Sequence, residues 1–445
     1  MPLSSWHAAA RAAFTGALEA GHPRAVTTQA MARLDDAPTY IIAIGKAALA
    51  MAQAVRDTGS TAPGIVVTHD EGFAEIDNMR CFASAHPVPD ARGLAASEAV
   101  IRAANELGAD DHLLLLISGG GSALLPAPTD GVTLEDKMAL NAALLASGLD
   151  IHAMNAVRRL FSRLKGGRLA RLAVPARITQ FLLSDVPGDR LESIASGPAV
   201  CDPVPLEQVL VMIADHALDR LDVVARMVPR IAEGTADLPL REGDPALRLV
   251  DTHLLASNDL CRTAATTSLA AHFADAARLD LPDLAGDAAT LARSLARSLA
   301  HHVSDTSSPD RMLFGVTGGE TTVKLDKISG KGGRAQEMVL AFADEMHRLG
   351  AEAPPRWLVL VGGTDGRDGP TDSAGAMIGA ADPFDAAVIK SCNSRRETRS
   401  VDKIGSANTS VRSVISAGLS SSAKDFRSIS KLLPRRSSSG TVSGR

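Results

Sequence analysis

The feature that most constrains the fold is a series of short, mainly apolar runs separated by alanine-rich stretches. Residues 40–45, 64–70, 112–118 and 178–186 form such runs, and helix-forming sequence follows several of them. Continuous apolar strands are typical of a parallel sheet that helices cover on both faces. We therefore expect an α/β fold with a doubly wound, Rossmann-like parallel sheet.

The length of the chain and a change of texture near residue 250 predict two domains. A chain of 445 residues is too long for one ordinary core. After residue 250 come an amphipathic helix over residues 287–303, two strands over residues 312–317 and 357–362, and glycine-rich loops. We expect an N-terminal domain over residues 1–250, a smaller α/β domain over residues 251–390, and a ligand cleft between them.

Residues 391–445 differ in composition from the rest of the chain. They contain 16 Ser, 11 Lys and Arg and 3 Asp and Glu, a net charge of +8, whereas residues 1–390 carry a net charge of −13. Such a composition predicts a disordered tail. The change begins abruptly at Ser391. We interpret it as the mark of a shifted reading frame in the gene.

Bulk properties exclude several classes of protein. The formal charge of −5 argues against a general nucleic-acid binder. No apolar run approaches the ~20 residues that a membrane span needs, and the first twenty residues are typical of an amphipathic helix rather than a signal peptide. The four cysteines form no C-x-x-C pair, which favours reduced thiols. We expect a cytoplasmic protein, either a monomer or a dimer, without nucleic-acid or membrane partners.

A first cluster of candidate site residues follows the run over residues 112–118. Glycines allow backbone N–H groups to converge on an anion, so this loop is a candidate phosphate or carboxylate site. The alternative is a tight turn that binds nothing. The loop consists of Ser118, Gly119, Gly120, Gly121 and Ser122.

A second cluster combines cations and carboxylates. Lys165 and Arg168 flank two glycines, Asp185 lies at the end of the run over residues 178–186, and Asp189 lies just past it. Aspartate at the end of a strand can hold Mg²⁺ or orient a hydroxyl nucleophile. The alternatives are a solvated helix end for the two cations and turn-forming aspartates for the two carboxylates.

A third cluster lies in the second predicted domain. Arg334 carries a planar, permanently charged fork that suits a phosphoryl group, and Glu320 lies in a glycine-rich turn. Asp365, Asp368 and Asp372 are candidate metal ligands, and the alternative is a series of Asp-Gly turns.

Lys46 is a further candidate, because it ends an apolar run. It is either a phosphate-facing charge or a lysine that extends its stem to reach water. Together with the three clusters it suits phosphoryl transfer, in which catalysis is mostly positioning and charge stabilisation. The substrate does not follow from these residues alone.

The motifs in their order resemble the glycerate 2-kinase family, whose C-terminal domain is the leucine-rich MOFRL type. The resemblance covers about residues 5–389. The matching segments are AIGKAA (43–48), HPVPD (86–90), LISGGGSALL (116–125), NAVRRLFSRLKGGRLA (155–170), LLSDVPGDRLESIASGP (182–198), GGETTV (318–323), GGRAQE (332–337) and GTDGRDGPTD (363–372).

The resemblance implies ATP-dependent phosphorylation of D-glycerate to 2-phospho-D-glycerate with a divalent cation such as Mg²⁺. It implies that Lys46 and Arg334 carry catalysis, that the glycine loop and the Asp185–Asp189 turn line the cleft, and that Glu320 and Asp365 face it from the second domain. Our expected catalytic residues are Lys46, Arg334 and Asp189. The expected substrate and phosphate ligands are Ser118, Gly119, Gly120, Gly121, Ser122, Lys165, Arg168, Asp185 and Glu320, and the expected metal ligands are Asp365 and Asp368.

The chain departs from the family pattern in two places. Ala335 stands where the family usually has Asn, and no T-G-P-T-G-T-N-V-like run follows residue 390. Two alternative functions therefore stay open. One is an NAD(P)H-dependent hydroxypyruvate reductase, a name that members of the family carry, although no strand is followed by a G-x-G-x-x-G motif. The other is an inactive, truncated kinase that only binds its ligands.

Overall fold

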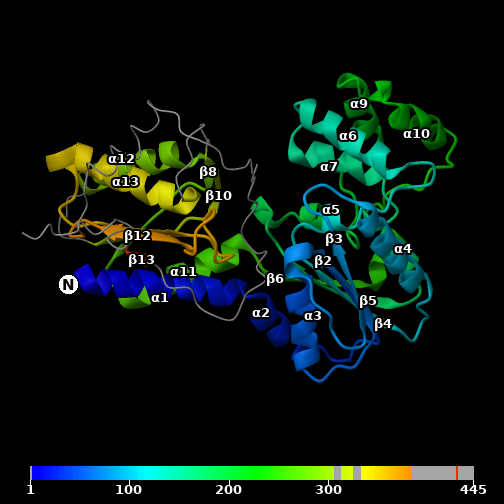
Figure 1. Ribbon diagram of the computed structural model, residues 1–445, viewed down its shortest axis with the longest axis horizontal. Helices are drawn as coiled ribbons and strands as arrows, with labels where there is room; N and C mark the ends of the chain where they lie inside the picture. The colour runs from blue at the N-terminus through cyan, green and yellow to red at the C-terminus, as the bar shows by residue number, and fades with distance from the viewer. Residues whose placement is uncertain (1–2, 305–311, 324–331, 383–426, 429–445) are drawn as a thin grey trace, which may run out of the picture. The chain divides into compact units, whose positions relative to one another are not determined.

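The computed structural model describes residues 3–304, 312–323, 332–382 and 427–428. The chain divides into two compact units (Figure 1). The first unit runs from Glu19 to Cys261. The second unit contains the residues up to Leu18 and the described residues from Arg262 on.

The first unit is built on a six-stranded parallel sheet with the order β3-β2-β1-β4-β5-β6. Because β1 lies between β2 and β4, the loops after β1 and β4 diverge at a topological switch point, where ligands usually bind in such sheets. The predicted doubly wound parallel sheet is confirmed. The strands are β1 (Tyr40–Ile44), β2 (Gly64–His69), β3 (Met79–Ser84), β4 (His112–Ile117), β5 (Arg177–Leu183) and β6 (Val250–Ala256).

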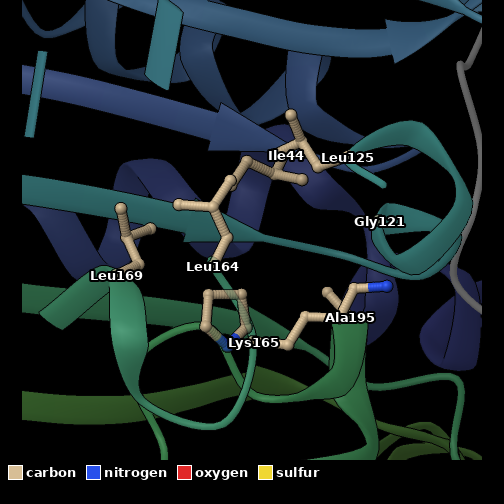
Figure 2. Close-up of a pocket in the computed structure, with 8 residues that line it drawn as sticks. Ile44, Gly121, Leu125, Leu164, Lys165, Leu169 and Ala195 are labelled. Carbon is tan, nitrogen blue, oxygen red and sulfur yellow. The ribbon is translucent and has the colours of Figure 1, made fainter. Parts of the chain in front are cut away.

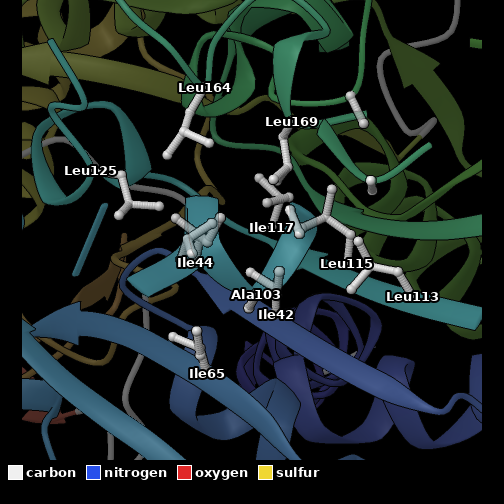
Figure 3. Close-up of a cluster of buried hydrophobic side chains, with 14 of the residues drawn as sticks. Ile42, Ile44, Ile65, Ala103, Leu113, Leu115, Ile117, Leu125, Leu164 and Leu169 are labelled. Atoms are coloured by element: carbon white, nitrogen blue, oxygen red, sulfur yellow. The ribbon is translucent and has the colours of Figure 1, made fainter. Parts of the chain in front are cut away.

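Both faces of this sheet are buried, which explains the mainly apolar runs. Successive strand residues point to opposite faces, so Ile41 packs with α2 (Pro23–Met31) and α3 (Ala48–Asp57). Its neighbour Ile42 packs with α4 (Ala91–Asn105) and α8 (Arg168–Leu172). Figure 3 shows the second of these clusters, with Ile42, Ile65 and Leu115 among its members.

A separate group of helices has its own apolar core. The helices are α6 (Leu134–Ala146), α7 (Ile151–Leu160), α9 (Leu206–Asp215) and α10 (Asp222–Ala232), and they lie together in Figure 1. Leu144, Val157 and Val209 are fully buried among them. The chain enters this group after β4 and again after β5, so the group is an insertion into the doubly wound pattern.

The second unit combines small sheets with helices. Its strands β11 (Leu358–Gly362) and β12 (Gly375–Gly379) pair antiparallel, and α12 (Ala288–Ser304) and α13 (Arg334–Leu349) pack with them around Met338 and Phe342. The other elements are α1 (Leu3–Gly21), α11 (Asn258–His272), β7 (Ala277–Leu279), β8 (Leu284–Asp287), β9 (Leu313–Gly315), β10 (Gly319–Thr322) and β13 (Arg427–Ser428).

The predicted domain bounds stay predictions. Strand β6, which begins at residue 250, pairs with β5 in the first unit, and α12 covers the helix expected over residues 287–303. Of the predicted tail over residues 391–445, all but residues 427–428 lie outside the described residues. Among the described helices, none combines the length and the apolar character that crossing a membrane requires.

Candidate functional site

Two loops at the carboxyl end of the large sheet are tied together by backbone hydrogen bonds. The N–H of Lys46, just after β1, donates to the carbonyl of Gly119, just after β4, over 2.9 Å. The N–H of Ala47 donates to Ser118 Oγ over 3.0 Å. Gly45 has φ +124° and lies against Ser118, so a side chain there would be strained and would clash. The serine and glycine pattern is therefore needed to bring the two strand ends together.

Glycines of the second loop allow charged side chains to approach its backbone. A Cβ on Gly119 would overlap the carboxylate of Asp185, which follows β5. A Cβ on Gly120, with φ +86°, would lie 3.0 Å from Cγ of Lys46 and 3.3 Å from the ring of His86. The structure thus brings Lys46, the glycine loop and Asp185 together, as the sequence predicts.

Sequence reasoning gave no role to His86, although its motif was noticed. His86 lies just after β3 and begins the His86–Pro87 cis peptide bond. Its ring is a neighbour of Gly120 in the loop described above. The sequence feature that could have identified His86 is the HPVPD segment at the carboxyl end of a strand. The carboxyl ends of parallel strands meet at one edge of a sheet, so residues just after them lie close together.

Ser122, the last residue of the glycine loop, is held by two other loops. Its carbonyl accepts a hydrogen bond from Lys165 Nζ over 2.8 Å, and its hydroxyl lies 2.7 Å from the hydroxyl of Ser196. Ser196 lies in a left-handed turn, with φ +63°, between two other left-handed residues, Ala195 and Gly197. Consecutive left-handed residues are strained, and such strain is concentrated at functional sites.

Lys165 lies inside the protein instead of at a solvated helix end. Its residue is 5% exposed and borders a cavity of about 10 Å³, room for about one water molecule (Figure 2). Burial, and then the charges of Arg158 and Arg159, lower the pKa of Lys165 to about 7. Its amine donates a hydrogen bond to the Ser122 carbonyl. Lys165 therefore contacts the loop that was expected to bind the ligand.

The lowered pKa of Lys165 predicts a pH-dependent stability. Between about pH 7 and its ordinary pKa of 10.5, the amine is neutral when folded and protonated when unfolded. The unfolded chain then binds one more proton, so this group makes the free energy of unfolding rise by about 1.4 kcal/mol per pH unit. Below about pH 7 both states are protonated and the contribution is constant. We expect the Lys165→Met variant to lose this rise, measured by urea unfolding across that pH window.

The free energy of unfolding is measured against pH for the wild type and the variant, and one curve is subtracted from the other. The contributions of the other titrating groups then cancel. The free energy of unfolding of the variant minus that of the wild type should fall steadily as the pH increases through the window. Parallel curves for the two proteins would contradict the lowered pKa.

The structure does not support the predicted phosphate-binding role of Arg168. This residue is 1% exposed, and its guanidinium donates to the Arg159 carbonyl over 2.7 Å and to Asp237. The arginine therefore joins α8 to the segment around Asp237 and has no face left for a phosphate. From the sequence alone, an arginine at the start of a helix gives no sign of whether it is solvated or buried. The buried, structural role of Arg168 could therefore not be recognised.

Asp189 occupies a left-handed position, with φ +51°, in the turn after β5. Its charge, after burial, helps to raise the pKa of the Cys261 thiol to about 11. The carboxylate thus acts on the beginning of α11, and its catalytic role stays a prediction.

In the second unit Arg334 forms an ion pair with Glu320. Its Nη1 donates to Glu320 Oε1 over 3.0 Å and lies 3.3 Å from the Thr321 carbonyl, so it ties the start of α13 to β10. The Arg334 side chain is 19% exposed. Two of the residues that the sequence selected in this unit, Arg334 and Glu320, are therefore neighbours.

Asp368, a predicted metal ligand, has a different role. Its two carboxylate oxygens accept hydrogen bonds from the backbone N–H groups of Ala335 and Gln336, over 2.9 and 2.8 Å. It is 3% exposed, and burial raises its pKa. A Cβ on Gly333 would overlap it. Asp368 is thus a cap on α13, supplied by a loop that is distant in sequence.

Asp365 shows the Asp-Gly turn that was the alternative interpretation. Its Oδ1 accepts a hydrogen bond from the N–H of Arg367 over 3.0 Å. Within residues 3–304, 312–323 and 332–382, the structure gathers no group of three or more His, Cys, Asp or Glu side chains that could hold a metal ion. A magnesium ion that is held mainly by substrate phosphates needs only one or two carboxylates.

Two family models match the chain. One is a domain of unknown function, DUF4147, over residues 9–229, and the other is the MOFRL family over residues 313–420. The chain is 33% identical to D-glycerate 2-kinase from Thermotoga maritima, over 81% of this chain and 83% of that protein. It is 36% identical to a putative hydroxypyruvate reductase from Agrobacterium vitis, over 83% of this chain and 82% of that protein.

A solved structure supports the same relationship. The crystal structure of glycerate kinase from Thermotoga maritima matches with a TM-score of 0.71 at 31% sequence identity. The match covers 85% of this chain and 87% of the other chain.

Proposed function

Because this chain belongs to the glycerate 2-kinase family, with a MOFRL-type C-terminal domain, we propose that it transfers the γ-phosphoryl group of ATP to the 2-hydroxyl of D-glycerate. The observation that carries the proposal is the convergence of Lys46, the glycine loop and Asp185 at the switch point of the sheet. It unites a cation, a glycine-rich backbone segment and a carboxylate where such sheets bind ligands.

The proposed mechanism is positioning and charge stabilisation. Phosphoryl transfer spreads negative charge over the transferred group, and fixed cations stabilise that charge. Lys46 and Arg334 would supply the cations, and Glu320 orients Arg334 through their ion pair. The glycine loop would bind the anionic part of a substrate through its backbone. Asp189 would orient the acceptor hydroxyl.

A divalent cation would neutralise phosphate charge when it is bound with ATP. Magnesium prefers carboxylate oxygens and usually keeps water and phosphate ligands. Asp185, half-buried at the end of β5, and Asp365, half-buried in its turn, fit such a role. Asp368 does not fit, because both of its oxygens cap α13.

The test is an assay with ATP, Mg²⁺ and D-glycerate, coupled to enolase so that only 2-phosphoglycerate gives a signal. We expect signal from the purified chain, and none when ATP or D-glycerate is left out. Folded protein that gives no signal at any substrate concentration would contradict the proposal.

The name of the Agrobacterium vitis relative motivates a second assay. Hydroxypyruvate and NADH are mixed with the same preparation, and the absorbance of NADH is followed. Oxidation of NADH that depends on hydroxypyruvate, without kinase signal, would favour a reductase.

The free thiols of Cys81, Cys201 and Cys261 fit the cytoplasmic setting that we propose for the enzyme.

A further inference from the structure

We propose that Lys165 and Ser196 are positioning residues, which fix Ser122 from two sides and so set the place of the glycine loop. The inference rests on the proposed function, because the loop is taken to bind a substrate. It differs from the prediction made for Lys165 from the sequence, in which its amine itself contacts the ligand.

The position of the Lys165 amine supports an action through the loop. Figure 2 shows its side chain extending past Ala195 toward the turn that carries Gly121. The amine donates to the Ser122 carbonyl over 2.8 Å. The cavity beside it holds about 10 Å³ and is bordered mainly by apolar side chains, among them Leu164 and Leu169. The apolar lining of that cavity does not favour a carboxylate or phosphate group of a substrate.

Ser196 supplies the second contact from a separate loop. Its hydroxyl is 2.7 Å from that of Ser122, and the residue is completely buried. Its carbonyl accepts a hydrogen bond from the N–H of Gly166, the residue after Lys165, over 3.1 Å. The two residues that hold Ser122 are therefore joined to each other. This closed set of contacts keeps Ser196 in its left-handed conformation.

The position of Ser122 matters because the residues just before it meet the candidate catalytic groups. Gly119 lies against Asp185, and Gly120 lies against Lys46. Gly121 packs so closely on Ala195 that a Cβ would come within 2.7 Å of it. If Ser122 moves, the three glycines before it can move as well. Glycines lack side chains that would hold their backbone in place.

The experiment compares Lys165→Met and Ser196→Ala with a matched control, Lys137→Met. Lys137 also has an amine whose pKa is lowered by burial, and it donates to the Phe161 carbonyl over 2.9 Å, outside the glycine loop. We expect kcat/KM for D-glycerate to fall about 10- to 100-fold in both loop variants. We expect the control to stay within about threefold of the wild type.

The double variant provides a second criterion. Since both side chains act on Ser122, the loss in the double variant should be smaller than the product of the two single losses. Equal values of kcat/KM in wild type and both single variants would overturn the proposal. So would an equal loss in the control, which would show that any buried lysine in this region has the same effect.

Hydrogen–deuterium exchange separates this inference from the proposed function. Peptides that cover residues 116–125 should exchange faster in both loop variants than in the wild type and the control. This readout needs no catalysis, so it tests the loop contacts even if the wild type does not phosphorylate D-glycerate. Should Lys165→Met not fold, Ser196→Ala, which removes one oxygen, carries the same test alone. Unchanged exchange in this segment would overturn the proposal.

Discussion

Replacing Arg334 with alanine is expected to lower kcat for D-glycerate phosphorylation by about 100-fold or more, as for other groups that stabilise charge in a transition state. The Arg334 side chain is partly exposed, Glu320 orients its guanidinium, and the residue is the first of α13. Alanine is a good helix former, and Asp368 still caps the helix through the backbone N–H groups of Ala335 and Gln336. The measurement is kcat in the enolase-coupled assay, with thermal unfolding alongside it.

Arg297→Ala is the matched control for this variant. Arg297 lies on α12 and forms an ion pair with Glu345 over 2.7 Å, so the control also removes an arginine–carboxylate pair from the second unit. Arg297 is exposed whereas Glu345 is buried, so thermal unfolding of the control is measured as well, to separate any loss of stability from a loss of activity. Near-normal kcat in Arg334→Ala, or equal losses in both variants, would contradict the catalytic role of Arg334.

Replacing Lys46 with methionine is expected to have a comparable effect, a loss of about 100-fold or more in kcat. Methionine keeps the aliphatic stem that lies against Gly120 and removes the charge, so the packing of the loop is retained. Steady-state kinetics with both ATP and D-glycerate would show whether the loss lies in kcat or in KM.

The outcome for Lys46 distinguishes two interpretations of the residue. A lysine that only extends to solvent from the end of β1 would leave kcat close to normal when its charge is removed. A fall in kcat with the unfolding temperature unchanged would establish the charge as part of the chemistry.

The sheet was predictable because its strands are buried on both faces. Residues 113–117 form an unbroken apolar run, and each of them is buried as the run predicts. The order of the strands was not predictable in the same way, since several apolar strands can pair in many orders. The helical group around Val157 and Val209 was also missed, because amphipathic helices between strands are equally expected as covers of a sheet.

The candidate site was predictable where its residues directly follow strands. Lys46 and the glycine loop meet because parallel strands end at one edge. Contacts between distant loops were not predictable. The Lys165 amine reaches a carbonyl 43 positions away, and Asp368 caps a helix whose start lies more than 30 positions earlier. No local pattern in a sequence marks such partners.

The central position of β1 has a consequence for the order of events during folding. The pairing of β4 with β1 brings together Thr39 and His112, which are 73 positions apart. Local helices form faster than such long-range pairs, because closing a long loop costs chain entropy before any contact is gained. Lys46 and Gly119 meet only when this closure is complete. During refolding, catalytic activity should therefore return later than helical content. The return of activity then reports when β1 and β4 have paired.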